Sequence, residues 1–355
     1  MQNANDLKVN LENILYGYYI KYNKLDELIS TAFPNESQTD TIDIYIDLFD
    51  MLKPIYSRDI YSNKRFVIVS SIINLAAHFR EYFRSRYRMY TRIFLVFGED
   101  LTNNHRQFYQ SFGSNAYKNT INFEKNNKFI HDQLEMVKIL CAYIYDIYYI
   151  HRNSIFSIFV YDNIIKNNNK NLSLIISKSQ YAYQLPALLD TVLFRPKKNK
   201  TGDVSFAVTQ SNVLFKYYSK INNEKVLDNF KKINPKLFSS ALAMTGIPSY
   251  GINSIMNTST MARLLTNAID DGKILNDYNH PQYLYNAIPE LSKYIDYSNF
   301  VFRFQAIDLL YQAIIYKNMP ESLDNSWYIN LNDKENFQYI NNKYFVDNPL
   351  NLNSL

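Results

Sequence analysis

The chain has 355 residues and a mass of 42.0 kDa, which suits one large α/β domain or two smaller ones. Hydrophobic residues make up 47% of the chain and only 7 residues are glycine, so the composition excludes a low-complexity chain. The formal net charge is +5, so any affinity for nucleic acid must come from local patches and not from the charge of the whole molecule.

Cysteine content and hydropathy restrict the compartment. The lone Cys141 excludes a disulfide framework and a cysteine-based zinc site, and we expect it to be a buried thiol in a reducing compartment. The first residues do not have the pattern of a secretory signal, and no window reaches the ~18 uninterrupted apolar residues that a membrane helix needs. We therefore expect a protein that is not secreted and has no membrane contact.

Apolar spacing predicts the secondary structure of the first third of the chain. Residues 1–40 carry apolar side chains at helical spacing, which predicts an N-terminal helical extension. A strand followed by a turn or helix is predicted over Thr41–Leu52, a long helix over Phe66–Tyr90, and a buried strand over Ile93–Phe97. This succession of strands and helices indicates an α/β fold.

The middle of the chain continues this alternation. The run Leu172–Ile176 is apolar and β-branched, as in a strand buried on both faces, and it leads through a small polar turn into a helical pattern that begins at Tyr181. Such a strand–turn–helix is where α/β folds build their sites. The other predicted elements are a helix over Asp132–Tyr145, a strand over Ile147–Ile150, and a hairpin of Thr191–Phe194 with Val204–Val208.

The last third reads as helical. Short helices are predicted over Asp270–Tyr294, and a single helix over Phe300–Tyr316. The segment after Pro320 is polar and rich in asparagine.

Arg80, Arg84 and Arg88 follow one another at a spacing of four residues, which places them on one face of the predicted helix over Phe66–Tyr90. Two interpretations are open. The stripe neutralises nucleic-acid phosphates, or it is a solvated face that pairs with Glu81.

The turn after Leu172–Ile176 resembles the strand–turn–helix of the 5′-nuclease family, which includes flap endonucleases and belongs to the wider PIN-like group. The family pattern is I-[IV]-S-G-D-x-D-x-x-Q-L, and its two aspartates bind metal. This chain keeps the serine and the final Gln184–Leu185, but Ser179 and Tyr181 stand where the aspartates are expected. The resemblance implies that the strand–turn–helix is kept and that the metal-binding aspartates are missing.

Two further strand ends resemble metal-binding positions of the family. Asp47 matches the aspartate that closes the first strand, although a solvated or capping aspartate explains it equally well. The family's second strand runs into F-D-G, whereas this chain reads Phe97–Gly98–Glu99–Asp100. Gly98 therefore stands where the family has its aspartate. Glu99 or Asp100 could take the place of that aspartate only if the turn were displaced, and a misplacement of a reacting group by ~1 Å can cost ~100-fold in reaction rate.

The family places G-x-E-A-D-D at the start of a later helix, and the corresponding positions here run from Ser154 to Ser157. None of these side chains suits Mg²⁺, which prefers carboxylate or carbonyl oxygens. We therefore predict no catalytic residue, no metal ligand and no cofactor. The degenerate positions are Asp47, Gly98, Ser154, Ser157, Ser179 and Tyr181.

Two other segments resemble the parts of the family that bind DNA. Arg106 and Lys118 fall in a stretch similar to the entry of the helical arch, where basic and aromatic residues alternate as in a single-strand path. An ordinary polar loop with buried tyrosines is the alternative there. Gly246, Gly251 and Thr258 match a helix-hairpin-helix, whose glycines let the backbone approach duplex phosphates.

The resemblance implies a fold and a domain plan. The expected fold is α/β, with a PIN-like central, mainly parallel sheet flanked by helices, a helical arch and a helix-hairpin-helix region. The expected parts are an N-terminal helical extension (1–40), an α/β core (41–235) with an arch at about 100–130, a helix-hairpin-helix and helical region (236–320), and a C-terminal tail (321–355).

Three functions follow as hypotheses. The first is a catalytically inactive 5′-nuclease-like protein that binds nucleic acid or acts as a scaffold in a viral or phage assembly, with DNA and protein partners, in the host cytoplasm or the virion. The 32 tyrosines, together with many Asn, Ile and Lys residues, are typical of an AT-rich genome, which suggests a virus, a phage, an organelle or a low-GC microbe as the source. The second is a purely structural component without DNA binding. The third is an active, Mg²⁺-dependent nuclease that uses Asp47, Glu99 and Asp100.

Overall fold

The computed structural model describes most of the chain between residues 40 and 317 and a few positions before it. The described residues are 26, 29–30, 40–56, 66–98, 123–152, 155–166, 171–196, 198–199, 202–203, 206–218, 224–248, 252–274 and 280–317.

A six-stranded sheet in the order β3-β2-β1-β4-β5-β8 forms the centre of the fold. All of its strand pairs are parallel except the last, in which β8 runs antiparallel to β5. The mainly parallel α/β sheet expected from the sequence is therefore confirmed. The strands are β1 (Thr41–Asp47), β2 (Tyr90–Gly98), β3 (Ile147–Arg152), β4 (Leu172–Ile176), β5 (Val192–Arg195) and β8 (Phe206–Val208), and a separate two-stranded hairpin joins β6 (Lys198–Asn199) to β7 (Gly202–Asp203).

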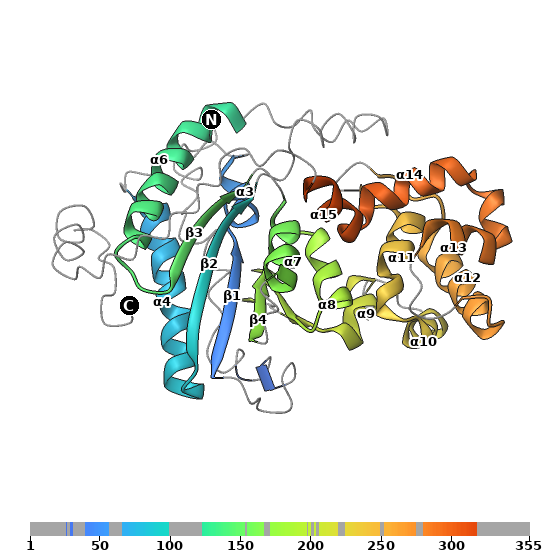
Figure 1. The fold of residues 1–355 in the computed structure, drawn as a ribbon, viewed down its shortest axis with the longest axis horizontal. Coiled ribbons are helices and arrows are strands. Elements are labelled where there is room, and N and C mark those ends of the chain that lie inside the picture. The colour runs from blue at the N-terminus through green and yellow to red at the C-terminus, as the bar shows by residue number, and fades with distance from the viewer. Residues whose placement is uncertain are drawn as a thin grey trace, which may run out of the picture.

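Helices cover both faces of this sheet, so its strands are buried on both sides (Figure 1). In β1, Ile44 and Ile46 belong to the core on one face and Tyr45 to the core on the other, as the two-residue period of a strand requires. The helices on the first face are α3 (Leu48–Tyr56), α4 (Val67–Tyr87) and α6 (Phe123–Cys141), and those on the second are α7 (Phe156–Lys166) and α8 (Gln184–Leu188).

A cross-strand ion pair neutralises an acid inside the sheet. Asp43 of β1 is fully buried and lies opposite Arg92 of β2 in the strand register. The Arg92 guanidinium donates from Nε and Nη2 to the two Asp43 oxygens over 2.7 and 2.6 Å. A buried carboxylate needs such a partner, because a bidentate guanidinium replaces the water that burial removes.

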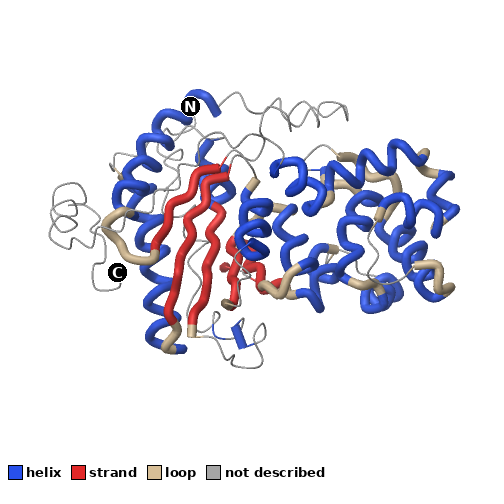
Figure 2. Tube along the Cα trace, viewed as in Figure 1, coloured by secondary structure: helices blue, strands red, loops and turns tan. Residues whose placement is uncertain are grey.

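The second half of the described chain is helical and continues the core of the α7 face. Figure 2 shows the strands gathered in one part of the molecule and helices alone in the other. One hydrophobic cluster runs from Tyr45 and Ile175 of the sheet to Phe238 and Phe300 of the helical part. The domain division at residue 236 stays a prediction. The helices are α9 (Val213–Tyr217), α10 (Glu224–Lys232), α11 (Phe238–Thr245), α12 (Thr258–Asp270), α13 (Pro281–Ala287), α14 (Tyr297–Ile307) and α15 (Leu309–Lys317).

The prediction of one helix over Phe300–Tyr316 is wrong, because the helix breaks at Asp308. The backbone of Asp308 is extended (φ −66°, ψ 119°), and its carboxylate accepts a hydrogen bond from the Tyr311 amide over 2.9 Å. Asp308 therefore ends α14 and caps α15, a role that aspartate fills well.

Two further predictions concern the thiol of Cys141 and membrane-spanning helices. Cys141 is buried as expected, and burial raises the pKa of its thiol. Among the described helices, none combines the length and the apolar character that a membrane crossing requires.

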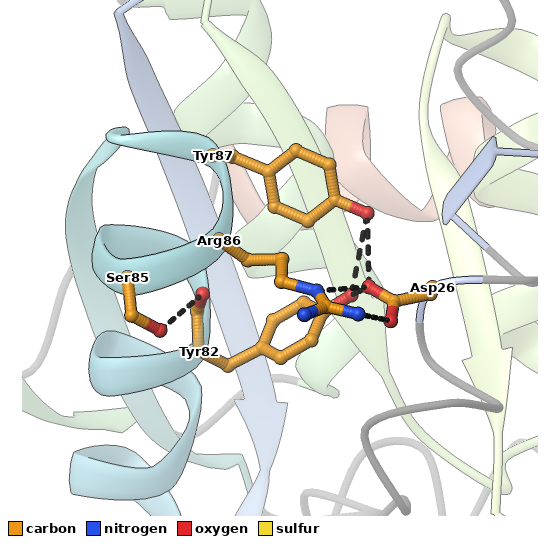
Figure 3. A network of polar contacts seen from close by, with 5 residues as sticks. All are labelled: Asp26, Tyr82, Ser85, Arg86 and Tyr87. Carbon is orange, nitrogen blue, oxygen red and sulfur yellow. Dashed lines mark hydrogen bonds and ion pairs between the residues drawn. The ribbon is translucent and has the colours of Figure 1, made fainter.

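Asp26 holds the N-terminal part of the chain against the end of α4 (Figure 3). Its carboxylate accepts hydrogen bonds from the Tyr82 hydroxyl (2.6 Å), Arg86 Nη2 (2.6 Å) and the Tyr87 hydroxyl (3.3 Å). The bonds from Arg86 and Tyr82 lower the pKa of Asp26 below its ordinary value of 3.8. The helix predicted within residues 1–40 lies almost wholly outside the described residues.

We expect Asp26→Asn to lower the free energy of unfolding at pH 7 by about 1 kcal/mol, since it removes the charge that accepts hydrogen bonds from Tyr82, Arg86 and Tyr87. A lowered pKa in the folded state stabilises the protein above the ordinary pKa, and that stability is lost as pH falls through the lowered pKa. The difference between the two proteins, measured by urea unfolding, should shrink as pH falls below 3.8. Asp228→Asn, which breaks an exposed ion pair with Lys231, is the control and should change stability by less than about 0.5 kcal/mol. Equal losses in both variants would contradict the prediction.

Candidate functional site

The carboxyl ends of the parallel strands meet at one edge of the sheet, where α/β proteins place their sites. β1 ends there at Asp47, β2 at Gly98, β4 at Ile176 and β5 at Arg195. Two polar segments lie at this carboxyl edge: the start of α3 after β1, and the turn of residues 177–180 after β4.

Asp47 is buried, with 3% of its surface exposed, and both of its carboxylate oxygens accept hydrogen bonds from the protein. Oδ2 accepts from the Ser177 hydroxyl over 2.7 Å, and Oδ1 accepts from the Asp50 amide over 3.0 Å. The second bond spans three residues at the start of α3, which is the geometry of a helix cap. The capping interpretation of Asp47 is thus supported by a direct contact.

A second carboxylate, that of Asp50, joins the same network. Its Oδ2 accepts from the amide of Lys178 over 2.7 Å, while the Ser179 amide donates to the Ser177 hydroxyl over 3.0 Å. Two acids from the β1–α3 connection therefore hold the turn after β4. The sequence pattern did not single out Asp50, although its place three residues after Asp47 puts both on one side of α3.

Two cations also reach this edge. Burial lowers the pKa of the half-buried Lys178 ammonium, Asp50 attracts that ammonium, and Arg195 repels it. Arg195 is held separately: its Nη1 donates to the Ser179 carbonyl over 2.6 Å, and its guanidinium lies 4.7 Å from the centre of the Tyr183 ring. The sequence pattern pointed to neither residue as part of a site.

Tyr181 and its neighbours attach the helical half to the sheet. Tyr181, in the short 3₁₀ helix η3 (Tyr181–Tyr183), is buried, and its hydroxyl donates to the Ala306 carbonyl over 2.9 Å. Gln184 donates to the Ile307 carbonyl and accepts from the Leu309 amide, each over 2.9 Å. Tyr181 thus serves the junction with α14 and α15.

The remaining degenerate positions are only partly described. Gly98 is buried at the end of β2, and Ser157 is buried in the first turn of α7. Ser154, together with Glu99 and Asp100 of the active-nuclease alternative, lies outside the described residues.

The fold brings together two histidines that belong to no common sequence motif. The rings of His131 in α6 and His151 in β3 lie 6.3 Å apart, and both contact Phe97 near the carboxyl edge. Within the part of the chain that the structure describes, no three His, Cys, Asp or Glu side chains group as a metal site would require.

The divalent ion that the family resemblance implies does not fit the described part of this edge. A Mg²⁺ ion requires several oxygen ligands at close to ideal octahedral geometry. Both Asp47 oxygens and one Asp50 oxygen already accept from protein donors, and the described residues supply no third acid, histidine or cysteine that would complete a metal site with them.

The arginine stripe does not form one exposed face. Arg80 is buried, and its guanidinium donates to the carbonyl of Tyr145. Arg84 is exposed, and Arg88 lies beyond α4 as its left-handed C-cap. Because α4 leads directly into the first residue of β2, Arg84 and Arg88 lie at the amino edge of the sheet, opposite Asp47.

The predicted helix-hairpin-helix falls on α11 and α12, which flank Gly246, and residues 249–251 between them lie outside the described residues. Ile247 and Ile252 form an antiparallel bridge across the turn, with N–O distances of 2.8 and 3.2 Å. The buried Arg303 of α14 holds both ends of the turn, since it donates to the carbonyls of Ala243 (3.0 Å) and Asn253. Asn257 caps α12 by accepting from the Thr260 amide over 2.8 Å.

Thr258 is the first residue of α12 and is half-buried. Gly251 of the turn, and Arg106 and Lys118 of the predicted arch, lie outside the described residues.

Comparisons with known proteins give a fold likeness and no family match. No protein-family model matches the chain, and no curated protein matches it in sequence. The chain resembles 5′-nucleases in structure. The bacteriophage T5 flap endonuclease, in a pseudo-enzyme–product complex with DNA and metal ions, is 12% identical at a TM-score of 0.46, over 77% of this chain and 91% of that chain.

Two further structures are similar at the same level. The T5 5′-exonuclease with bound zinc is 10% identical, with a TM-score of 0.44 over 77% of this chain and 92% of its own. Human GEN1 in complex with Holliday junction DNA is 10% identical, with a TM-score of 0.40 over 79% of this chain and 66% of its own. These likenesses concern the fold alone.

We expect Ser177→Ala to reduce the free energy of unfolding by about 2 kcal/mol, because it leaves the buried Asp47 carboxylate without one of its donors. Thermal or urea unfolding measures the loss. Ser85→Ala, which removes a 3.3 Å bond from an exposed hydroxyl to the Tyr82 carbonyl, is the matched control and should stay within about 0.5 kcal/mol of wild type. A neutral Ser177→Ala would show that the bond to Asp47 does not stabilise the edge.

We expect Gly246→Ala to destabilise the hairpin by about 3 kcal/mol or more. Gly246 has φ +74°, and an added Cβ would lie 2.3 Å from the Ile252 carbonyl oxygen. Gly272 has a similar φ of +67° but no atom within 4 Å of such a Cβ, so Gly272→Ala isolates the backbone strain and should cost about 1 kcal/mol. Chemical denaturation of both variants distinguishes contact from strain, and equal losses would exclude the contact.

Proposed function

We propose that this chain is a 5′-nuclease-like protein that does not cleave nucleic acid and that serves as a nucleic-acid-binding or scaffolding subunit of a viral or phage assembly. The observation that carries the proposal is the bonding of Asp47. Its two oxygens accept from Ser177 and from the Asp50 amide, so they hold two connections of the fold together.

The chemistry of phosphodiester cleavage explains why this bonding matters. Metal-dependent nucleases activate a water molecule and stabilise the leaving oxygen with divalent ions held by several carboxylates. Here Asp47 and Asp50 are bonded to protein donors, and the Arg195 guanidinium is bonded to the Ser179 carbonyl of the turn that supplies those donors. The edge is suited to hold strands and helices in place without a metal ion.

The turn between α11 and α12 supports a remaining contact with nucleic acid. The described ends of this turn are held by the Ile247–Ile252 bridge and by Arg303. A preformed turn at the start of a helix presents main-chain amides to phosphate at low entropic cost. In this proposal the contact is made by Gly251 and Thr258, because Gly246 is buried and its amide donates to the Leu242 carbonyl over 2.7 Å.

A purely structural role without DNA binding is the second candidate. Two observations favour it: Asn257 already uses an amide of the first turn of α12, and Arg80 is buried against the Tyr145 carbonyl. Both contacts remove groups that would otherwise bind phosphate.

A cleavage assay tests the loss of catalysis. The full chain is incubated with a 5′-flap DNA in Mg²⁺ or Mn²⁺, and we expect no cleavage above the buffer control. Mg²⁺-dependent cleavage that is abolished in Asp47→Ala would overturn the proposal and favour the nuclease that uses Asp47, Glu99 and Asp100.

A binding titration separates the two remaining roles. Fluorescence anisotropy with flap DNA between 50 and 200 mM salt should show binding that weakens with salt, and about four phosphate contacts give a slope of about −3.6 in log K against log salt. Thr258→Glu should weaken binding, because it places a negative charge at the α12 turn. Ser298→Glu, in the first turn of α14, is the matched control and should bind as wild type. Absence of binding at low salt would favour the structural role.

A further inference from the structure

The end of α4 carries two exposed arginines to the amino edge of the sheet, where the parallel strands begin (Figure 1). Arg80 is buried, and its guanidinium donates to the carbonyl of Tyr145 in the turn that leads into β3. Arg84 is exposed and lies one helical turn further along the same side of α4. Arg88 follows as the left-handed C-cap and is also exposed. These edge arginines, Arg84 and Arg88, thus continue the side of α4 that contacts the turn before β3.

The other arginines of this edge are paired with acids. Arg86 binds Asp26 and Arg92 binds Asp43, each with a nitrogen–oxygen distance of 2.6 Å. Among the residues that the structure describes, the edge arginines have no acidic partner, and their side chains are exposed to solvent. Positive charge that the protein does not neutralise itself is available to a polyanion.

Two exposed tyrosine rings belong to the same edge. Tyr90, the first residue of β2, is 46% exposed, and Tyr145 is 55% exposed. The Tyr90 hydroxyl donates to the carboxylate of Asp146, the residue after Tyr145, so the Tyr90 ring is held in place. Asp146 also accepts from the Tyr148 hydroxyl over 3.3 Å. An exposed ring held in this way is suited to stack on a nucleobase, because it loses little conformational freedom on binding.

Arginine charge beside exposed tyrosine rings favours single-stranded nucleic acid over the two other polyanions that a basic surface attracts. A duplex keeps its bases stacked within itself, so it offers phosphates to the arginines but no base to the rings. An acidic protein segment offers carboxylates to the arginines and has no base to stack on the rings. A single strand uses both kinds of side chain.

We propose that the amino edge of the sheet is a binding surface for single-stranded nucleic acid, in which Arg84 and Arg88 contact phosphates while Tyr90 and Tyr145 stack on bases. This surface lies at the opposite end of β1 and β2 from Asp47, and apart from the turn between α11 and α12 (Figure 1). The inference deepens the nucleic-acid-binding role proposed above and rests on it. It names the substrate class and adds a second contact surface.

The test is fluorescence anisotropy of the full chain with a labelled oligothymidylate of about 12 nucleotides, a length within the usual range of single-strand sites. The wild type should bind it, and binding should weaken as salt rises. Arg84→Gln/Arg88→Gln removes both charges and keeps long side chains. We expect this variant to bind at least about tenfold more weakly at low salt, with the slope of log K against log salt reduced by about 1.4, because each single-strand phosphate contributes about 0.7.

Tyr145→Ala tests the stacking separately, because the contact between Tyr145 and Arg80 is made by the backbone carbonyl and is kept. Binding should weaken at least about fivefold, and the salt slope should not change, since no charge is removed. Tyr145→Phe keeps the ring and should bind as wild type.

Lys231→Gln/Lys232→Gln is the matched control for the arginine variant. It removes two exposed charges from α10, where both lysines pair with acids, and it should bind within about twofold of wild type. Every substituted residue is exposed, so the thermal midpoints of all variants should stay close to that of wild type.

If wild type binds, and either the arginine variant or Tyr145→Ala binds equally well, this inference alone is overturned. Polyglutamate of the same length that displaces the oligothymidylate at equal concentration would also overturn it alone, because charge without stacking would then explain the binding. Absence of wild-type binding to both the oligothymidylate and flap DNA would overturn the inference together with the nucleic-acid-binding role.

Discussion

The hydrogen bond from the Ser177 hydroxyl to the Asp47 carboxylate is the contact on which the functional edge depends. It joins the ends of the two central strands β1 and β4, which lie side by side in the sheet. Asp47 also caps α3 through the Asp50 amide, and Asp50 in turn holds the Lys178 amide. A buried carboxylate that lost these donors would carry an uncompensated charge. Removing one donor from the network should therefore lower the stability of the folded protein.

The helical half depends on the same strand end. The segment that follows the turn, from Tyr181 to Gln184, bonds the carbonyls of Ala306 and Ile307 where α14 passes into α15. Gln184 is fully buried and also accepts from the Ser239 hydroxyl of α11 over 3.0 Å. Tyr181, one of the positions where the resemblance expects an aspartate, thus lies in a junction between the sheet and the helices, where an uncharged side chain with a fixed partner costs less to bury than a carboxylate.

Acidic side chains are neutralised in different ways inside the sheet and at its carboxyl edge. Inside β1, Asp43 is neutralised by a bidentate contact with Arg92, which lies directly across the strand pair. At the carboxyl edge, Asp47 and Asp50 rely on a hydroxyl, backbone amides and nearby cations. In both places the described acids are bonded to donors of the protein itself.

The sequence by itself determined the strand–helix order and the burial of the central strands, because apolar runs such as Leu172–Ile176 and the alternation in β1 depend on local pattern. It also indicated the turn between two helices at Gly246, where φ is positive. It misjudged the helix over Phe300–Tyr316, since the Asp308 cap breaks an otherwise continuous apolar period. It also placed Arg80 on an exposed face with Arg84 and Arg88, because helical spacing does not tell which turn of α4 is covered by its neighbours.

Only the tertiary structure decided the composition of the carboxyl edge. Ser177 and Asp47 are separated by 130 residues in the chain, and Lys178 and Asp50 by 128, so no local spacing links them. The parallel register of β1 and β4 makes them neighbours, and it is this register that turns an unremarkable serine–lysine pair into the partners of two acids. Charge neutralisation is a property of distances in space, which a linear pattern does not contain.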